Sequence, residues 1–195
     1  ISEVNAREIL DSRGNPTVEV DVTLDDGTVG RASVPSGAST GAHEVVELRD
    51  GDKHRYDGLG VQTALKKVVC EIAPHIVGMH PQNQSEIDSV LVTLDGTPAL
   101  SRLGGNAILG ISMAVAHAET SRLGTPLYQY LADGCSTILP VPMFNILNGG
   151  RHAKNSTDVQ EFMVVPAGFE TMSLAVQAGA EIYHVLKHIL DKRGL

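Results

Sequence analysis

A change of hydrophobic period near residue 60 constrains the fold more than any other feature of the sequence. Between residues 16 and 34, apolar and polar residues alternate, as they do in a strand with one buried face. The alternating apolar positions are Val18, Val20 and Val22. Asp25-Asp26-Gly27 supplies turn chemistry before the pattern resumes at Val29. The segment predicts an antiparallel hairpin, which Ala6–Leu10 joins as a third strand.

Beyond Gly60 the apolar residues recur every three or four positions, which is typical of amphipathic helices. The first helix is expected to end at Gly78. Further helices are expected around residues 87–91, over 108–123 and over 127–131. The first part of the chain is therefore predicted to be an α+β domain, in which a three-stranded antiparallel sheet packs against a helical bundle.

A second pattern begins after the small polar stretch at residues 133–137. Residues 143–147 and 160–165 are short apolar runs that predict buried strands, and residues 172–192 have a helical period. Strands followed by a helix indicate the start of an α/β layer. The expected domains are residues 1–134 and 138–195.

Composition and charge exclude several classes of protein. The net charge of −8 and the sequence pI near 5.4 argue against nucleic acid or an anionic membrane as the main partner, although a small anionic substrate is not excluded. No apolar run reaches the length of about 18 residues that a membrane span needs, and the first residues do not resemble a leader peptide. Cys70 and Cys135 lack metal or redox spacing, so free thiols and a cytoplasmic location are expected.

Two polar segments carry the candidate chemistry. Pro35–Ala42 places hydroxyl side chains and glycines directly after a predicted strand, and such a loop can close over an anionic ligand or offer an oxygen to Mg²⁺. The second segment, Asn148–Asn155, has a glycine pair before His152 and is followed by Gln160 and Glu161 at the start of a predicted strand. The alternative for each segment is a solvated polar loop with no ligand.

Other patterns are less specific. His184 and His188 are four residues apart on one predicted helix, but the glutamate of a zinc-protease motif is absent, so a surface pair is the better interpretation. The glycines of the first loop are not followed by Lys-Ser or Lys-Thr, which excludes a P-loop.

Several runs, in order along nearly the whole chain, together resemble the enolase family. They are Ala6–Val20, Val34–Gly41, Glu47–Lys53, Gly105–Gly110, Asn148–Ala153 and Gln160–Met163. The resemblance implies a lyase of glycolysis and gluconeogenesis that dehydrates 2-phosphoglycerate to phosphoenolpyruvate with two Mg²⁺ ions. It also implies that the second domain is the start of an enolase-type β/α barrel, and that the protein is a homodimer or larger.

The resemblance assigns metal-binding, substrate-binding or catalytic roles to four residues of this chain. Ser39 matches a loop serine that ligates the second Mg²⁺, and His152 matches a histidine near the substrate phosphate and the leaving group. Gln160 and Glu161 match substrate-binding residues, and Glu161 also supports the acid end of the catalytic reaction. By the same resemblance, Glu19 and the region of Arg13 match dimer contacts.

The resemblance places the remaining catalytic groups, namely a further glutamate, the lysine base and three carboxylate ligands of Mg²⁺, beyond Leu195. The 195 residues alone are therefore expected to be inactive. Two hypotheses follow, an enolase whose chain is shortened or a noncatalytic family member with a structural or partner-binding role. An acid-sugar dehydratase of the wider superfamily fits the serine-containing loop poorly.

Overall fold

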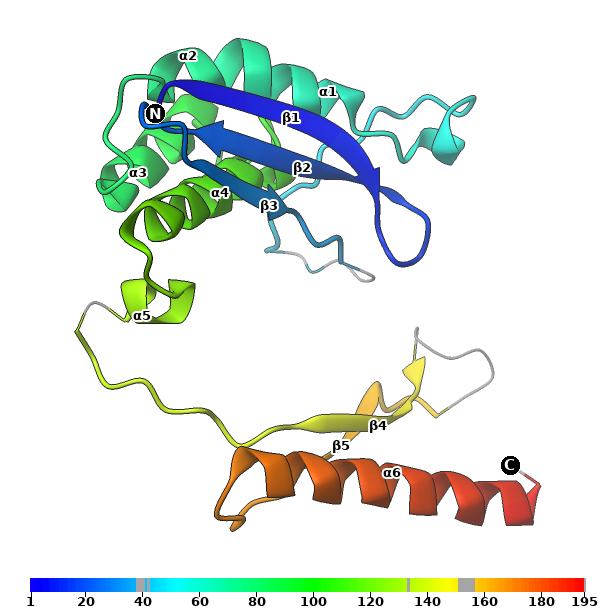
Figure 1. The fold of residues 1–195 in the computed structure, drawn as a ribbon. Helices are drawn as coiled ribbons and strands as arrows, with labels where there is room; N and C mark the ends of the chain where they lie inside the picture. The colour runs from blue at the N-terminus through cyan, green and yellow to red at the C-terminus, as the bar shows by residue number, and fades with distance from the viewer. Residues whose placement is uncertain (38–40, 42, 133, 151–156, 195) are drawn as a thin grey trace. The chain divides into compact units, whose positions relative to one another are not determined.

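The chain forms two compact units, Ile1–Cys135 and Ser136–Leu195, and each is described by itself (Figure 1). The computed structural model describes residues 1–37, 41, 43–132, 134–150 and 157–194. None of its helices, over these residues, is both long and apolar enough to cross a membrane.

The first unit begins with a three-stranded antiparallel sheet in the order β1-β2-β3, as the alternating pattern predicted. The strands are β1 (Glu3–Leu10), β2 (Pro16–Thr23) and β3 (Val29–Ser33). In the register of the sheet, Val20 lies opposite Ala6 on one side and Ala32 on the other. The alternating valines of β2 are fully buried, because helices cover that face of the sheet (Figure 1).

Helices form the rest of the first unit. They are the short 3-10 turn η1 (Tyr56–Gly58), α1 (Gln62–Lys67), the π-helical turn η2 (Val68–Ile72), α2 (Ala73–Ile76), α3 (Gln84–Asp95), α4 (Gly105–Leu123) and α5 (Leu127–Leu131). The single helix expected between Gly60 and Gly78 thus contains a wider turn. Pro74 has no N–H to donate to the carbonyl of Cys70, which explains why the α-helical bonding pattern breaks there.

Helix α4 packs directly on the sheet. A methyl group added at Gly30 of β3 would lie 2.1 Å from the backbone nitrogen of Ala118 in α4, so the two backbones touch. At Gly110 of α4, an added methyl would lie 2.8 Å from the side chain of Val20. The helix starts at Gly105, three residues before the predicted start, and most of its residues are buried. This close contact fixes the position of β3 and of the chain that leaves it.

Over its described residues, the second unit has two antiparallel strands and one long helix. They are β4 (Phe144–Asn148), β5 (Glu161–Val164) and α6 (Met172–Arg193). The hydroxyl of Thr171 caps α6 by accepting the N–H of Leu174 at 3.2 Å. The ring of Phe144 lies against Gly179. The strands were predicted to be buried within a barrel, and Met163 is 47% exposed here because the described two-stranded sheet with one helix has too few elements to cover both faces or to close a barrel.

Candidate functional site

The segment that contains Ser39 leaves β3 from a fixed position. The N–H of Val34 donates to the carbonyl of Val18 at 2.8 Å, and the hydroxyl of Thr17 donates to the carbonyl of Val34 at 2.6 Å. Thr17 and Val34 are both buried. Ser39 itself lies outside the described residues. The structure therefore defines the start of this loop without placing its candidate metal ligand.

The chain that follows the loop is anchored to the start of α4. The N–H of Gly105 donates to the carbonyl of Val46 at 2.8 Å. The buried side-chain amide of Asn106 binds both backbone groups of Leu48, accepting its N–H at 3.1 Å and donating to its carbonyl at 3.1 Å. The amide thus replaces a neighbouring strand for this extended segment. The end of the loop is therefore tied to α4 by backbone and side-chain hydrogen bonds.

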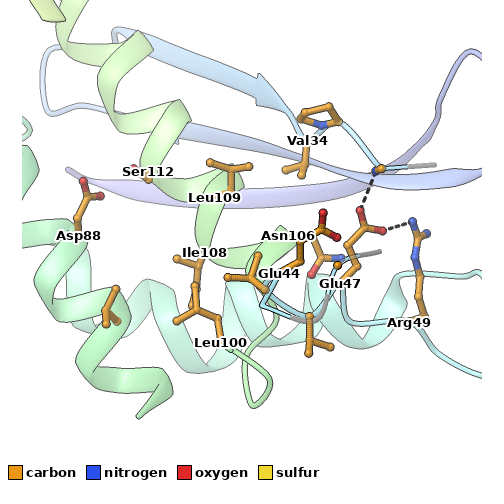
Figure 2. Close-up of a pocket in the computed structure, with 17 residues that line it drawn as sticks. Val34, Glu44, Glu47, Arg49, Asp88, Leu100, Asn106, Ile108, Leu109 and Ser112 are labelled. Atoms are coloured by element: carbon orange, nitrogen blue, oxygen red, sulfur yellow. Dashed lines mark hydrogen bonds and ion pairs between the residues drawn. The ribbon is translucent and has the colours of Figure 1, made fainter. Parts of the chain in front are cut away.

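Glu47 and Arg49 connect the two ends of the loop (Figure 2). One carboxylate oxygen of Glu47 accepts the backbone N–H of Gly37 at 3.2 Å, and the other pairs with Arg49 at 2.7 Å. Arg49 also donates to the hydroxyl of Ser36 at 2.9 Å. The two side chains therefore bridge residues on either side of the segment that contains Ser39.

A second arginine holds the beginning of the same loop. Arg13 donates to the carbonyl of Ser36 at 3.0 Å and to that of Gly37 at 3.5 Å. Asp11 orients Arg13 by accepting its backbone N–H at 2.8 Å, and the N–H of Asn15 donates to the same carboxylate. The hydrogen bond from Asn15 is the main cause that lowers the pKa of Asp11, so this carboxylate is charged at neutral pH.

A pocket of about 870 Å³ lies beside these contacts in the first unit (Figure 2). Its walls are largely apolar, and acidic side chains also line it. The apolar side chains include Val45, Val46, Val92, Ile108 and Leu109, and the acidic ones are Glu44, Glu47 and Asp88. Arg49 is the single basic residue among the described residues that line the pocket, and its guanidinium is already bonded to protein oxygens. The pocket therefore does not have the chemistry of a phosphate site.

The other candidate residues belong to the connection between β4 and β5. Glu161 lies opposite Asn148 in the strand register, and the N–H of Gly149 donates to the carbonyl of Gln160 at 2.8 Å. A side chain at Gly149 would collide with the backbone, since an added methyl would lie 2.2 Å from the carbonyl of Val159. The two ends of the connection are thus joined where Gln160 and Glu161 begin β5.

His152 lies within this connection, outside the described residues. The pairing register of β4 with β5 shifts between Asn145 and Leu147. Glu161 is half-buried and Gln160 is exposed. The predicted roles of Ser39, His152, Gln160 and Glu161 remain predictions on this geometry.

The described residues do not form a magnesium site by themselves. Over the part of the chain that the structure describes, no three His, Cys, Asp or Glu side chains gather around a point that could hold a metal ion. Cys70 and Cys135 are free and exposed.

Sequence reasoning missed the residues that hold the first loop, namely Arg13, Glu47, Arg49 and Asn106. A usable signal was present, because Glu47 and Arg49 are two positions apart in an extended segment and therefore share a side of the chain. Their run was recognised only as part of the family resemblance. The partner of Asn106 depends on how α4 docks and has no local signal.

Comparison with protein families matches both parts of the chain. The model described as enolase, N-terminal domain, matches residues 1–131. The model described as enolase, C-terminal TIM barrel domain, matches residues 136–195. These matches agree with a three-stranded sheet plus helices, followed by the first elements of a barrel that is not closed by these residues. The chain belongs to the enolase family.

Proposed function

We propose that these residues belong to an enzyme that dehydrates 2-phosphoglycerate to phosphoenolpyruvate, a hydro-lyase reaction of glycolysis. The observation that carries the proposal is the closed connection between β4 and β5. Its ends meet at Gly149 and Gln160, next to Glu161, and His152 lies between these ends in the sequence of the unit that matches the enolase barrel. Enolase-family membership supports a phosphorylated small molecule as the substrate.

In this proposal the residues of the chain divide the work. His152 and Gln160 contact the substrate, and the carboxyl group of Glu161 assists departure of the 3-hydroxyl group as water. Ser39 offers its hydroxyl oxygen to the second Mg²⁺. Bound Mg²⁺ supplies electrostatic stabilisation of the negative charge that develops when the C2 proton is removed.

The proposal includes a cytoplasmic homodimer. Glu19 lies on β2, and its carboxylate accepts hydrogen bonds from Arg7 at 2.6 Å and Ser33 at 2.7 Å. These bonds join all three strands of the sheet and hold Glu19 in a fixed position. The family resemblance assigns Glu19, together with the region of Arg13, to the contact between two copies.

The test is Glu161→Gln in a polypeptide that continues these residues through a closed enolase barrel. Formation of phosphoenolpyruvate from 2-phosphoglycerate is followed by absorbance. We expect kcat to fall by about 100-fold or more with a smaller change in KM, because the carboxyl group acts mainly in the transition state. Glu181→Gln is the matched control, since Glu181 is exposed on α6 and bonds only to Gln177 in the described contacts.

A change in KM alone would make Glu161 a binding residue without a catalytic role. Ser39→Ala in the same polypeptide tests the metal role, and we expect it to raise the Mg²⁺ concentration needed for half-maximal activity. If the unaltered polypeptide forms no phosphoenolpyruvate, the second hypothesis, a noncatalytic structural or partner-binding member of the family, becomes the better one.

A further inference from the structure

We propose that Arg49 is a positioning residue. Together with Glu47, it fixes the positions of the residues directly before and after the loop that contains Ser39. This inference rests on the proposed function, because the position of the loop matters only if Ser39 binds Mg²⁺. The contacts that support it are made by Ser36, Gly37, Glu47 and Arg49. Neither Arg49 nor Glu47 is assigned a contact with substrate or metal.

The guanidinium of Arg49 gathers four oxygens from separate parts of the first unit. One terminal nitrogen donates to the carbonyl of Pro16 at 2.5 Å and to that of Leu59 at 2.7 Å. The other donates to the hydroxyl of Ser36 at 2.9 Å and to the carboxylate of Glu47 at 2.7 Å. The side chain is only 20% exposed. Such a set of contacts fixes the guanidinium in a single orientation.

Glu47 completes a ring of contacts across the two ends of the loop. Arg49 donates to the hydroxyl of Ser36. The next residue, Gly37, donates its N–H to Glu47 at 3.2 Å, and Glu47 pairs with Arg49 (Figure 2). Residues before and after Ser39 are thereby joined through side chains as well as through the loop itself. These contacts fix the separation of Gly37 from Glu47, and joining the ends of a loop offsets the entropy cost of closing it.

The ring is anchored to the core on its Glu47–Arg49 side. Asn106 at the start of α4 binds both backbone groups of Leu48, the residue between Glu47 and Arg49. Helix α4 in turn packs on the sheet at Gly30. The position of the ring is therefore set by the packing of α4, and the ring passes that position on to Ser36 and Gly37.

The contacts of Arg49 require the geometry of arginine. A guanidinium presents several N–H groups in a rigid plane, whereas a lysine ammonium is a single point that cannot reach the same separated acceptors. Arg49→Lys keeps the charge and removes the fork, which makes it a sharper test than Arg49→Ala. Ser36→Ala is a second, milder variant, since it removes one partner and leaves Arg49 in place.

The matched control is Arg102→Lys. Arg102 also ties backbone to side chains, because it donates to the carbonyls of Leu94 and Asp95 and to the carboxylate of Glu71. None of these three acceptors belongs to the ring around Arg49. Loss of its fork is expected to lower stability without a selective effect on the loop.

The experiment is hydrogen–deuterium exchange by mass spectrometry, at short labelling times, on the 195-residue chain. We expect peptides covering residues 35–48 to exchange about tenfold faster in Arg49→Lys, a factor that corresponds to about 1.4 kcal/mol of lost stabilisation. Ser36→Ala is expected to give a smaller increase in the same peptides. Peptides from α4 are expected to keep their original exchange rates in both variants, and Arg102→Lys to leave residues 35–48 unchanged.

Unchanged exchange of residues 35–48 in both Arg49→Lys and Ser36→Ala would overturn the inference. Uniformly faster exchange across the first unit would also overturn it, since it would make Arg49 an ordinary stabilising residue. A second measurement uses the polypeptide with a closed barrel, in which Arg49→Lys is expected to raise the Mg²⁺ concentration for half-maximal activity at least about threefold, a change of about 0.6 kcal/mol.

The two measurements separate this inference from the proposed function. A shifted Mg²⁺ profile in Ser39→Ala with none in Arg49→Lys would contradict the positioning role. An unchanged profile in Ser39→Ala would instead contradict the metal role of Ser39, whatever the exchange experiment shows.

Discussion

Apolar strand residues are buried very differently in the two units of the chain. Val18 and Val20 of β2 have no exposed surface. By contrast, Phe162 of β5 is 43% exposed, and Val165, the residue that follows β5, is 50% exposed. The strands of both units have apolar side chains in strand-like patterns. They differ in how many elements surround them: several helices and two neighbouring strands in one case, one helix and one strand in the other.

The comparison shows that a strand pattern predicts an element, while its burial depends on partners elsewhere in the chain. Helix α4 covers the first sheet closely enough that Gly30 is needed at the contact. In the second unit, the buried residues among those described are few, and they include Ala175 and Gly179 of α6. The first unit therefore has a core of its own, whereas the apolar strand side chains of the second unit stay partly exposed.

The largest expected effect comes from separating the units. A fragment of residues 1–135 is expected to unfold cooperatively with urea, because its core is complete. A fragment of residues 136–195 is expected to show no cooperative transition, since it cannot bury enough apolar surface to offset the conformational entropy of folding. Circular dichroism with urea titration measures both. A cooperative transition in the second fragment would remove the distinction between the units.

Limited proteolysis of the whole chain gives an independent measure of the same difference. Residues 136–143 contain no helix or strand and are largely exposed. Cleavage is expected there first, leaving a core that ends near residue 135. A stable product that begins near residue 136 and outlasts the first unit would contradict this.

The next effect compares glycine-to-alanine changes at the two close contacts. At Gly30, an added methyl meets the backbone of Ala114 and Ala118, which moves only if the whole helix α4 shifts. Gly30→Ala is expected to lower the free energy of unfolding by about 3 kcal/mol or more. At Gly179, the added methyl meets the ring of Phe144 at 2.3 Å, and a half-buried side chain can move more easily than a helix backbone.

Gly179→Ala is therefore expected to keep or slightly raise the helix content of α6, because alanine has a helix propensity about 1 kcal/mol better than glycine. Val29→Thr, at an exposed position of β3, is the control for Gly30→Ala and should cost little. Urea unfolding and circular dichroism report both changes. Equal losses at Gly30 and Gly179 would mean that the second unit is packed as rigidly as the first.

A smaller effect concerns the acid stability of the first unit. Burial acts to raise the pKa of Asp95, but the hydrogen bonds that its carboxylate accepts from Thr97 and Leu103 outweigh this and lower the pKa below its ordinary value. The stabilisation is fully present above about pH 4, the range of the unfolded carboxyl group, and is lost as the pH falls through the lowered folded value.

Asp95→Asn removes the charge while keeping the shape of the side chain. It is expected to lower the free energy of unfolding by about 1–3 kcal/mol at neutral pH, with a smaller difference from the unaltered protein near pH 3. Urea titrations at the two pH values measure this. A difference that is equal at both values would show that the charge of Asp95 is not what stabilises the α3–α4 connection.

Much of the fold was predictable from the sequence because its signals are local. The alternation of Val18, Val20 and Val22 predicts β2, and the helical period from residue 172 predicts α6. The π-helical turn before Ala73 was not predicted, because the period of the apolar residues does not show which carbonyl each backbone N–H reaches. The exposure of β4 and β5 agrees with the expectation that their apolar side chains need the other strands of a barrel to be buried.

The candidate site was less predictable for a related reason. Ser39, His152, Gln160 and Glu161 were singled out by resemblance to the enolase family, and their roles remain proposals. The contacts that hold the first loop involve residues far apart in the sequence, such as Arg49 with Pro16 and Asn106 with Leu48. No local sequence pattern predicts these long-range hydrogen bonds, because they form only when α4 has packed on the sheet.

The smallest expected effect is on a surface contact of α6. Gln177 donates to Glu181 at 2.7 Å, four residues along an exposed face. Gln177→Ala loses a contact worth about 0.2–0.5 kcal/mol and gains helix propensity of similar size, so the helix content should stay nearly unchanged.

The matching pair in the first unit is Arg122 with Glu119 at 2.6 Å, where Glu119 is fully buried. Arg122→Ala would leave that charge unpaired, at a cost of about 3 kcal/mol or more. Circular dichroism measures the helix content of both variants. If Gln177→Ala lost as much helix as Arg122→Ala, the surface contact of α6 would matter as much to its unit as the buried pair does to the first unit.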